Sequence, residues 1–361
     1  MFGNKRTILL GLVLTLALFA HVANADYIFG TPTNMGPIVN SSSYEWYPSI
    51  RADGLEMYFE SNRPGGEGTY DIWVSTRETK EDDWGAPTNL GAPINTPDWQ
   101  NTPAISADGL ELYFTAGFLW VARRATVSDP WGEPENDSLI NVNAIGAMGP
   151  GLSSDGLSLF FSSYWPKPTF SWDLDLYVST RPTRDDLWSE PVNLGPTVIG
   201  VHSTSENYCP TISADGLVLV FSSNRPGGFG GDDLWMTRRT TIDGPWSEPV
   251  NLGPTINSDR LEASPEISPD GKSLLFSSDR REGRVGGVDI WQVSIDPVVD
   301  FNGDGIVDSA DMCIMIDHWG EDYSLCDIGP TPFGDGVVDV QDLIILAEHL
   351  FEEIPPADPN I

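Results

Sequence analysis

The sequence predicts an all-β fold made of five repeated units, because one short pattern recurs five times along its 361 residues. In each copy an Asp-Gly pair is followed by apolar residues that alternate along the chain, as they do in a β-strand with one buried face. The content of 36 Gly and 29 Pro favours the many turns that an all-β chain requires. The pairs begin at Asp53, Asp108, Asp155, Asp215 and Asp270, at spacings of 55, 47, 60 and 55 residues.

Each unit is predicted to contain four short strands. In the second unit, residues 102–106 form the first strand, residues 107–109 a tight turn and residues 110–115 the second strand. A third strand begins at an Asp, and a fourth carries a motif that runs from Trp to Gly, as at residues 84–91. Four short strands per unit, repeated about an axis, are typical of propeller blades. We therefore predict a five-bladed β-propeller over residues 26–297.

The two ends of the array are predicted to meet. The fifth unit ends at Ile295 without a fourth strand, whereas residues 29–36 match residues 84–91 at an offset of 55. The N-terminal segment can therefore supply the outer strand of the last blade and close the ring. An open solenoid is the alternative, but it would leave an exposed strand edge, which invites aggregation.

Several stretches resemble a known repeat. Residues 268–280 have the sequence Ser-Pro-Asp-Gly-Lys-Ser-Leu-Leu-Phe-Ser-Ser-Asp-Arg, and residues 61–66 and 223–228 both have Ser-Asn-Arg-Pro-Gly-Gly. These stretches resemble the WD-like propeller repeat of the periplasmic protein TolB and its relatives. Unit two departs from the pattern at Phe118, where the other units have Asp, and unit three has a different loop at residues 164–172. The resemblance implies a fold and little about chemistry.

The C-terminal segment contains a pattern of oxygen ligands. Counted from Asp300, side-chain oxygens fall at loop positions 1, 3, 5, 9 and 12, with Gly305 at position 6, where the loop must turn sharply. Hard oxygen ligands at this spacing suit Ca²⁺. A second, partial copy lies at residues 334–342. The predicted ligands are Asp300, Asn302, Asp304, the Ile306 carbonyl, Asp308 and Asp311 in the first loop, and Asp335, the Val337 carbonyl, Asp339 and Asp342 in the second.

Two such loops, each followed by a helical pattern and ending in Asp at position 12, resemble a type I dockerin over residues 298–353, leaving 354–361 as a tail. The resemblance implies a cohesin-like partner on a scaffold or surface protein, contacted in part through loop positions 10 and 11. Thr331 and Phe333 fall where ligands 1 and 3 of the second loop belong, so that site is weaker, unusual or empty, unless Asp327 moves in.

The charge of this segment supports a metal-dependent fold. Residues 298–353 hold 14 Asp and Glu and no Lys or Arg, and such a compact module repels itself unless cations neutralise it. We therefore expect its folding to be coupled to Ca²⁺. A solvated acidic tail is the alternative. Cys313 and Cys326 either form a disulfide or remain two buried thiols.

Residues 1–25 are predicted to be a signal peptide. Lys5 and Arg6 precede an apolar run at residues 8–20 that is short for a membrane span, and Ala-Asn-Ala at 23–25 fits a cleavage site. The mature chain is therefore expected to be exported, either secreted or attached to the cell surface; an uncleaved anchor is the alternative. The formal net charge of −34 repels phosphate backbones and anionic membranes, so neither is an expected partner.

The sequence assigns no catalytic residue. Only His202 of the four His lies in the predicted propeller, and no CxxC, HExxH or P-loop motif is present. Glycosidases built on five-bladed propellers use carboxylates from the innermost strands. Polar residues that merely solvate the channel mouth are the alternative interpretation. The candidates near that mouth are Glu45, Glu206 and Glu262, with Gln100 and Asn207 at similar positions.

Aromatic residues that do not recur with the repeat are expected on the same face. Aromatic rings beside convergent polar groups suit sugars or peptide segments. The Trp residues that do recur in register are predicted to pack in the core instead. The ligand candidates are Trp46, Trp99, Trp165, Trp172 and Tyr208.

These patterns predict a secreted, non-catalytic binding or scaffolding protein. Its propeller is expected to bind polysaccharide or protein, and its calcium-dependent module to attach it to a cohesin-bearing partner. The alternatives are a carbohydrate-active enzyme of the glycoside hydrolase type and a purely structural surface protein.

Overall fold

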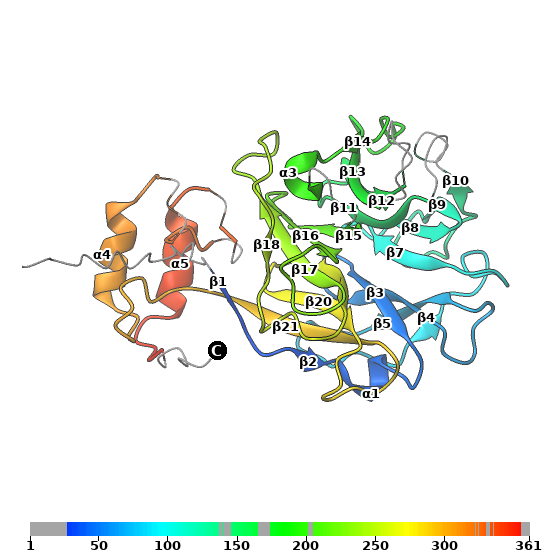
Figure 1. Ribbon diagram of the computed structural model, residues 1–361, viewed down its shortest axis with the longest axis horizontal. Coiled ribbons are helices and arrows are strands. Elements are labelled where there is room, and N and C mark those ends of the chain that lie inside the picture. Colours follow the sequence, from blue (N-terminus) through cyan, green and yellow to red (C-terminus); the bar gives the residue numbers. More distant parts are fainter. Residues whose placement is uncertain are drawn as a thin grey trace, which may run out of the picture.

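The computed structural model describes residues 27–136, 140, 146–164, 174–200, 205–321, 323, 325–329, 333–334 and 336–354. Five antiparallel sheets stand around a central axis (Figure 1), which confirms the predicted five-bladed propeller. The predicted signal peptide lies outside the described residues. Within the described ranges, no helix has the length and apolar character needed to cross a bilayer.

Each blade runs from an inner strand at the channel to an outer strand at the rim. We call the face that carries the Asp-Gly turns the turn face, and the opposite face, with its longer loops, the loop face. The blades are, in order, β3 (Glu45–Ile50), β4 (Glu56–Ser61), β5 (Asp71–Thr76) and β6 (Thr88–Asn89); β7 (Asn101–Ile105), β8 (Glu111–Ala116), β9 (Phe118–Arg123) and β10 (Glu135–Asn136); β11 (Met148–Leu152), β12 (Ser158–Ser163), β13 (Asp175–Thr180) and β14 (Val192–Asn193); β15 (Asn207–Ile212), β16 (Val218–Ser223), β17 (Asp233–Arg238) and β18 (Val250–Asn251); and β19 (Glu262–Ile267), β20 (Ser273–Ser278) and β21 (Asp289–Pro297), joined by β1 (Tyr27–Phe29) and β2 (Thr33–Asn34).

The hydrophobic core lies between neighbouring blades. Sheets cover both faces of the second strands, so all six residues of β16 are buried. Phe59 and Trp73 of blade one pack against Leu275 and Ile290 of blade five. Recurring Trp residues such as Trp73 are therefore part of the core, as the repeat pattern predicts.

Glycine allows neighbouring blades to touch on the loop face. A Cβ atom at Gly68 would lie 2.1 Å from the carbonyl oxygen of Asp98, and one at Gly230 would lie 2.0 Å from that of Arg260. Only glycine permits this approach of two backbones. In blades one, four and five this contact holds the loop between the second and third strands against the loop that precedes the next blade.

The N-terminal strands close the ring, as predicted. Asn34 of β2 pairs with Trp291 of β21, and Tyr27 of β1 pairs with Pro297 at the end of the same strand. Asn40, which follows the short helix α1 (Gly36–Val39), donates through Nδ2 to the Ile290 carbonyl at 2.9 Å and accepts the Ile290 N–H through Oδ1 at 2.8 Å.

The C-terminal residues form a small helical lobe beside the propeller, with α4 (Ser309–Asp317) and α5 (Val340–Glu348) side by side (Figure 1). The two halves of the lobe exchange backbone contacts. Val307 N donates to the Glu352 carbonyl, and Val338 N donates to the Glu321 carbonyl. The lobe is therefore an internal repeat of two loop–helix units.

Phe333 fixes this lobe against the propeller. Its ring is 7% exposed and meets the Tyr27 ring edge-on, at 5.0 Å between centroids. The Arg238 guanidinium of β17 lies 4.9 Å from the Tyr27 ring and 5.9 Å from the Phe333 ring. Strand β1 is thus held between the last blades and the lobe.

We expect Asn40→Ala to lower the free energy of unfolding by about 1 to 3 kcal/mol, because it leaves the N–H of Ile290 buried without a partner, whereas the Ile290 carbonyl keeps its hydrogen bond from Met35 N at 3.1 Å. Urea denaturation followed by tryptophan fluorescence measures the loss. Thr33→Ala, which removes an exposed 3.3 Å bond to the same strand, is the control and should cost less than about 0.5 kcal/mol. Similar losses in both variants would contradict this role of Asn40.

Candidate functional site

The five inner strands surround the channel and share one backbone feature. Each carries a proline that follows a residue with φ between 51° and 60°, in the left-handed region. The strand pairing is irregular at this point, and a β-bulge there re-aims a side chain. The residues with positive φ, all of which line the channel, are Tyr47, Thr102, Gly149, Cys209 and Ser264.

Tyr47 lies in the channel at the level of the bulges. Its hydroxyl is close to Cys209 of blade four and Ser264 of blade five. Burial raises the pKa of the Tyr47 hydroxyl well above its usual range, and it also raises the pKa of the Cys209 thiol, so both groups are neutral at physiological pH. We call the part on the loop-face side the mouth, and the part that opens to the turn face the well.

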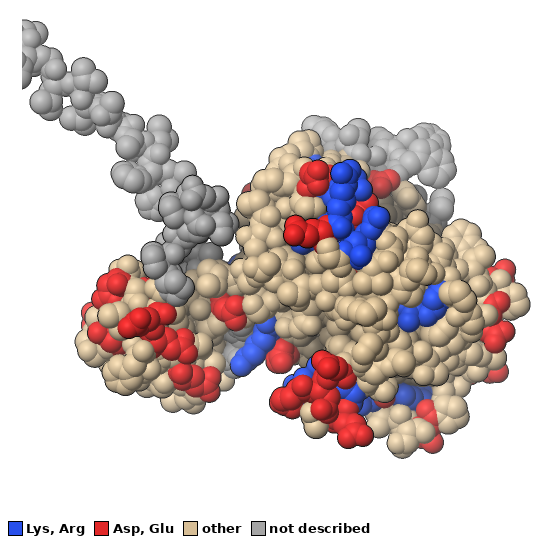
Figure 2. All heavy atoms as spheres, turned by 90° about the horizontal axis from the view of Figure 1, so that it is seen from below, with Lys and Arg blue, Asp and Glu red and all other residues tan. Residues whose placement is uncertain are grey.

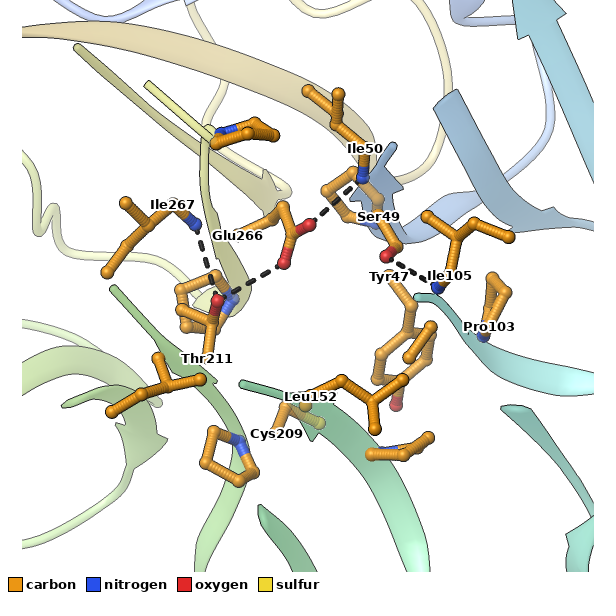
Figure 3. Close-up of a pocket in the computed structure, with 18 of the residues that line it drawn as sticks. Tyr47, Ser49, Ile50, Pro103, Ile105, Leu152, Cys209, Thr211, Glu266 and Ile267 are labelled. Carbon is orange, nitrogen blue, oxygen red and sulfur yellow. Dashed lines mark hydrogen bonds between the residues drawn. The ribbon is translucent and has the colours of Figure 1, made fainter. Parts of the chain in front are cut away.

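The well has a volume of about 170 Å³ and contains a single carboxyl group, that of Glu266 (Figure 3). Glu266 Oε1 accepts the Ile50 N–H at 2.9 Å, and Oε2 accepts the Thr211 hydroxyl at 3.2 Å. Burial raises the pKa of Glu266 to about 7, against a usual value of 4.5. The surrounding walls combine hydroxyl groups with apolar side chains, the latter from Ile50, Ile105, Leu152, Ile212 and Ile267.

Glu60 is the buried carboxyl group of the mouth. It is 4% exposed, and its one hydrogen bond is accepted from Thr102 N at 3.3 Å. Burial raises the pKa of Glu60 to about 8, so this carboxyl is mostly protonated at neutral pH and can donate a hydrogen bond. The residues at the same position in the other four blades are hydroxyls, namely Thr115, Ser162, Ser222 and Ser277.

Two aromatic residues stand at a second repeat position in the mouth. Trp46 lies opposite Glu60 in the strand register, and Tyr208 occupies the Trp46 position in blade four. Burial, and after it the nearby Asp232 carboxylate, raises the pKa of the Tyr208 hydroxyl well above its usual range. The mouth therefore combines two half-buried aromatic rings, a neutral carboxyl group and a second carboxylate.

The predicted carboxylates Glu45 and Glu262 lie inside their blades. Both are fully buried. Glu45 accepts hydrogen bonds from the Ser41 hydroxyl at 2.6 Å and from Arg63 Nη2 at 3.0 Å, and Glu262 has the equivalent partners in blade five. Gln100 and Asn207 occupy the same repeat position and are buried in the same way. These four residues shape the loops that precede the inner strands.

The other ligand candidates differ in exposure. Trp99 is 64% exposed on the loop face, and Glu206 is exposed beside Tyr208. Trp165 and Trp172 lie outside the described residues. The loop face carries further exposed aromatic residues, which are Tyr44, Phe118 and Phe229.

The first C-terminal loop has a compact, internally bonded form. Asp300 Oδ2 accepts Gly305 N at 2.8 Å, Asp304 Oδ1 accepts Ile306 N at 3.0 Å, and Asp311 Oδ1 accepts Phe301 N at 2.8 Å. Figure 2 shows clusters of acidic residues on this lobe. The described residues include no group of three or more His, Cys, Asp or Glu side chains that converges as a metal site does. The loop therefore contains the oxygen donors that the sequence predicts, but within the described residues its charged side chains do not converge on a common point.

The second loop has the same form with Asp327 in the place of Asp300. Asp327 Oδ2 accepts Gly336 N at 2.6 Å, and Asp342 Oδ1 accepts Ile328 N at 2.7 Å, as Asp300 and Asp311 do in the first loop. Four residues, 330–333, are inserted after Gly329 relative to the first loop. The structure thus aligns Asp327, instead of Thr331, with position 1, and Phe333 packs on the propeller. Asp335 lies outside the described residues.

Sequence reasoning missed Glu60 and Glu266, although the repeat contains the information. Glu60 stands where blades four and five have the first Ser of Phe-Ser-Ser, and Glu266 follows the inner-strand proline where other blades have Ser49, Ala104, Gly151 or Thr211. Both are departures from a small or hydroxyl residue at a repeated position. The thiols of Cys313, exposed, and Cys326, buried, are free.

Comparisons with known proteins bear on the fold. A thermostable family-43 glycoside hydrolase matches with a TM-score of 0.51 at 16% identity, over 73% of this chain and 92% of that chain. TolB from Acinetobacter baumannii matches with a TM-score of 0.44 at 16% identity. The match covers 72% of this chain and 56% of the TolB chain. The catalytic domain of the Coprinopsis cinerea GH62 alpha-L-arabinofuranosidase matches with a TM-score of 0.43 at 14% identity, over 71% and 98% of the two chains.

No protein-family model matches the chain, and the search of curated proteins found no match. At these identities, the structural similarity shows a shared propeller fold and nothing more.

The raised pKa of Glu60 makes the stability of the protein depend on pH. Because the folded state binds this proton more tightly than the unfolded chain, Glu60 reduces the free energy of unfolding as pH rises from about 4.5 through about 8. The loss is on the order of a few kcal/mol. Glu60→Gln should therefore lose less stability than the wild type between pH 5 and pH 9 in urea denaturation.

Glu133→Gln, at an exposed site in blade two, is the matched control and should follow the wild-type pH profile. A Glu60→Gln profile parallel to that of the wild type would show that this carboxyl keeps an ordinary pKa.

Proposed function

We propose that this chain is an exported, non-catalytic protein that binds polysaccharide at the mouth of its propeller and is attached to a partner protein through its C-terminal lobe. The observation that carries the proposal is the break in the repeat at the mouth. Trp46 and Tyr208 stand where the other blades have Asn101, Met148 and Ala263, and Glu60 stands where the other blades have a hydroxyl.

The chemistry of the mouth supports a sugar ligand. Half-buried aromatic rings offer faces on which sugar rings stack, and the neutral Glu60 carboxyl and the Tyr208–Asp232 pair offer hydrogen bonds to hydroxyl groups. The net charge of −34 opposes polyanionic ligands, so a neutral or weakly charged glycan fits better. The exposed Trp99 extends the aromatic surface beyond the mouth.

The C-terminal lobe is proposed to bind Ca²⁺, as the resemblance to dockerins implies. The first loop supplies side-chain oxygens from Asp300, Asn302, Asp304 and Asp311, and its Gly305 has the positive φ of 88° that the sharp turn needs. This donor set fits a hard cation. A bound cation would offset the mutual repulsion of these carboxylates, so ion binding and ordering of the lobe are expected to be coupled.

The second loop is proposed to bind Ca²⁺ as well, with Asp327 as its first ligand. Its hydrogen bonds reproduce those of the first loop despite the inserted residues. Gly334 and Gly336 have φ values of 73° and 93°, matching 73° and 88° at Gly303 and Gly305. Since Gly329 stands at position 3 and provides no side-chain oxygen, the second site is expected to be weaker than the first.

The partner of the lobe is proposed to be a cohesin-like domain that contacts α5. The first turn of α5 exposes Val340, and the next turn exposes Ile344, whereas the equivalent residues of α4 are Ser309 and Cys313. The two halves therefore present different surfaces, and docking in a single orientation is expected. Export through the predicted signal peptide places the protein where such a partner would be found.

A carbohydrate-active enzyme is the second candidate, and Glu60 is the observation that favours it. A carboxyl with a pKa of about 8 beside an aromatic mouth has the property of a general acid. The match to the family-43 glycoside hydrolase shows a shared fold only. Asp232, which lies close to the Tyr208 hydroxyl, would be the carboxylate available as its counterpart.

We expect Trp46→Ala to weaken glycan binding at least tenfold, because the variant removes an aromatic face from the mouth. A glycan array followed by calorimetry with the full chain measures the affinity. Trp319→Ala, which removes an exposed Trp of the lobe, is the control and should bind as the wild type does.

Equal glycan binding by the wild type and Trp46→Ala would place the ligand elsewhere. Release of shortened glycan products by the wild type, abolished in Glu60→Gln, would replace the binding proposal with the enzyme.

We expect the chain to bind two Ca²⁺ ions, with Asp300→Asn removing the tighter site and Asp327→Asn the weaker one. Calorimetric titration of the full chain with CaCl₂ measures the stoichiometry, and circular dichroism measures the gain of helix. Asp317→Asn, at an exposed position of α4 outside both loops, is the control. No heat and no spectral change on addition of Ca²⁺ would contradict the metal proposal without bearing on glycan binding.

A further inference from the structure

The well on the turn face has one charged group in otherwise uncharged walls. All five inner strands contribute to its lining, and Glu266 is the only Asp, Glu, Lys or Arg among the lining residues. The mouth residues Trp46, Glu60 and Tyr208 are not among the lining residues of the well, so the well can be tested separately from the proposed polysaccharide site. Its chemistry has no part in the function proposed above.

Glu266 provides more than its place in the repeat requires. At the same position in other blades, the Ser49 and Thr211 hydroxyls accept a backbone N–H from the next inner strand, at 3.1 and 3.4 Å. Glu266 Oε1 does the same for Ile50 N at 2.9 Å. Since a hydroxyl is sufficient for this contact, the charge and the second oxygen of Glu266 are surplus to it. Figure 3 shows this carboxyl between Ile50 and Thr211, pointing into the well.

Acidic turns surround the opening of the well. In each blade the residue directly before the Asp of the Asp-Gly turn lines the well, so the five Asp encircle the opening. Asp53 pairs with Arg51, and Asp108 pairs with Arg184. The other three, Asp155, Asp215 and Asp270, make no ion pair with the described residues. Lys80 and Arg77 nevertheless interact electrostatically with Asp270, and Arg239 does so with Asp215.

We propose that the well binds a primary ammonium group on a short aliphatic stem, with Glu266 as its counter-ion. A volume of about 170 Å³ holds on the order of ten water molecules, which is enough room for a stem of a few carbons. The Ile, Leu and Pro walls cover the stem. The three N–H groups of the ammonium meet Glu266 and the adjacent hydroxyls of Ser49 and Thr211.

Other cations fit the well less closely. A guanidinium group pairs with both oxygens of a carboxylate in a fork, but Ile50 N and the Thr211 hydroxyl already occupy one direction on each oxygen. A divalent metal ion needs several oxygen ligands, and the walls supply a single carboxylate. An ammonium group needs one charged partner and two neutral acceptors, which the well provides.

The ammonium group has two natural sources, a free alkylamine and the side chain of a lysine in a peptide. Calorimetric titration of the full chain with n-butylamine tests the first, and titration with a lysine-containing tripeptide blocked at both ends tests the second. Titrations at pH 8.5 keep both partners charged, because the pKa of Glu266 is about 7. Binding of butylamine alone assigns the site to free amines, and binding of the peptide assigns it to lysine side chains.

Glu266→Gln should weaken binding at least tenfold, and Glu133→Gln should leave it unchanged. Ala214→Phe, which places a ring at the exposed rim of the well and leaves Glu266 intact, should also abolish binding and guards against misfolding of the first variant. The proposal is overturned if neither ligand binds, if n-butanol binds as well as n-butylamine, or if both well variants retain wild-type affinity.

Discussion

Pairing of the N-terminal strands with β21 is the constraint on which the rest of the structure depends. Five sheets can enclose a channel only if the first and last are joined, and the Asn40–Ile290 and Asn34–Asp289 hydrogen bonds join them. The same pairing removes the edge that an open array would expose. With the ring closed, the five inner strands face one axis, and residues distant in the sequence, such as Tyr47 and Cys209, come into contact.

The carboxyl groups of the channel stand at positions where the sequence departs from the repeat. At the positions of Glu60 and Glu266 the other blades carry small or hydroxyl residues, and several of these hydroxyls accept a backbone N–H from the next inner strand, as those of Ser49, Thr211 and Ser222 do. Glu60 and Glu266 keep those contacts and add a carboxyl group that the contacts do not require. Both added carboxyl groups are buried in the channel, and this burial raises their pKa values.

The sequence predicted the blade count and the closure because both depend on local patterns that recur. Asp-Gly turns and alternating strands are visible without any knowledge of distant contacts. The site was harder to predict, because the sequence alone does not distinguish a polar residue exposed at a strand end from one buried within a blade. Glu45 and Glu262 were expected near the channel mouth, yet Arg63 and Arg280 hold them inside their sheets. The role of Asp327 as the first residue of the second loop was also hard to predict, because the sequence alone does not show where the four inserted residues are accommodated in the fold.

The contact of Phe333 with Tyr27 has a consequence for any assembly that this chain joins. If a flexible linker alone joined the lobe to the propeller, the two could rotate relative to each other, and the loop face could point in many directions. Here the Phe333 ring of the lobe packs against Tyr27 of the first strand of the propeller, beside the Arg238 side chain. Any partner that bound the lobe would therefore also be held in a defined orientation relative to the propeller.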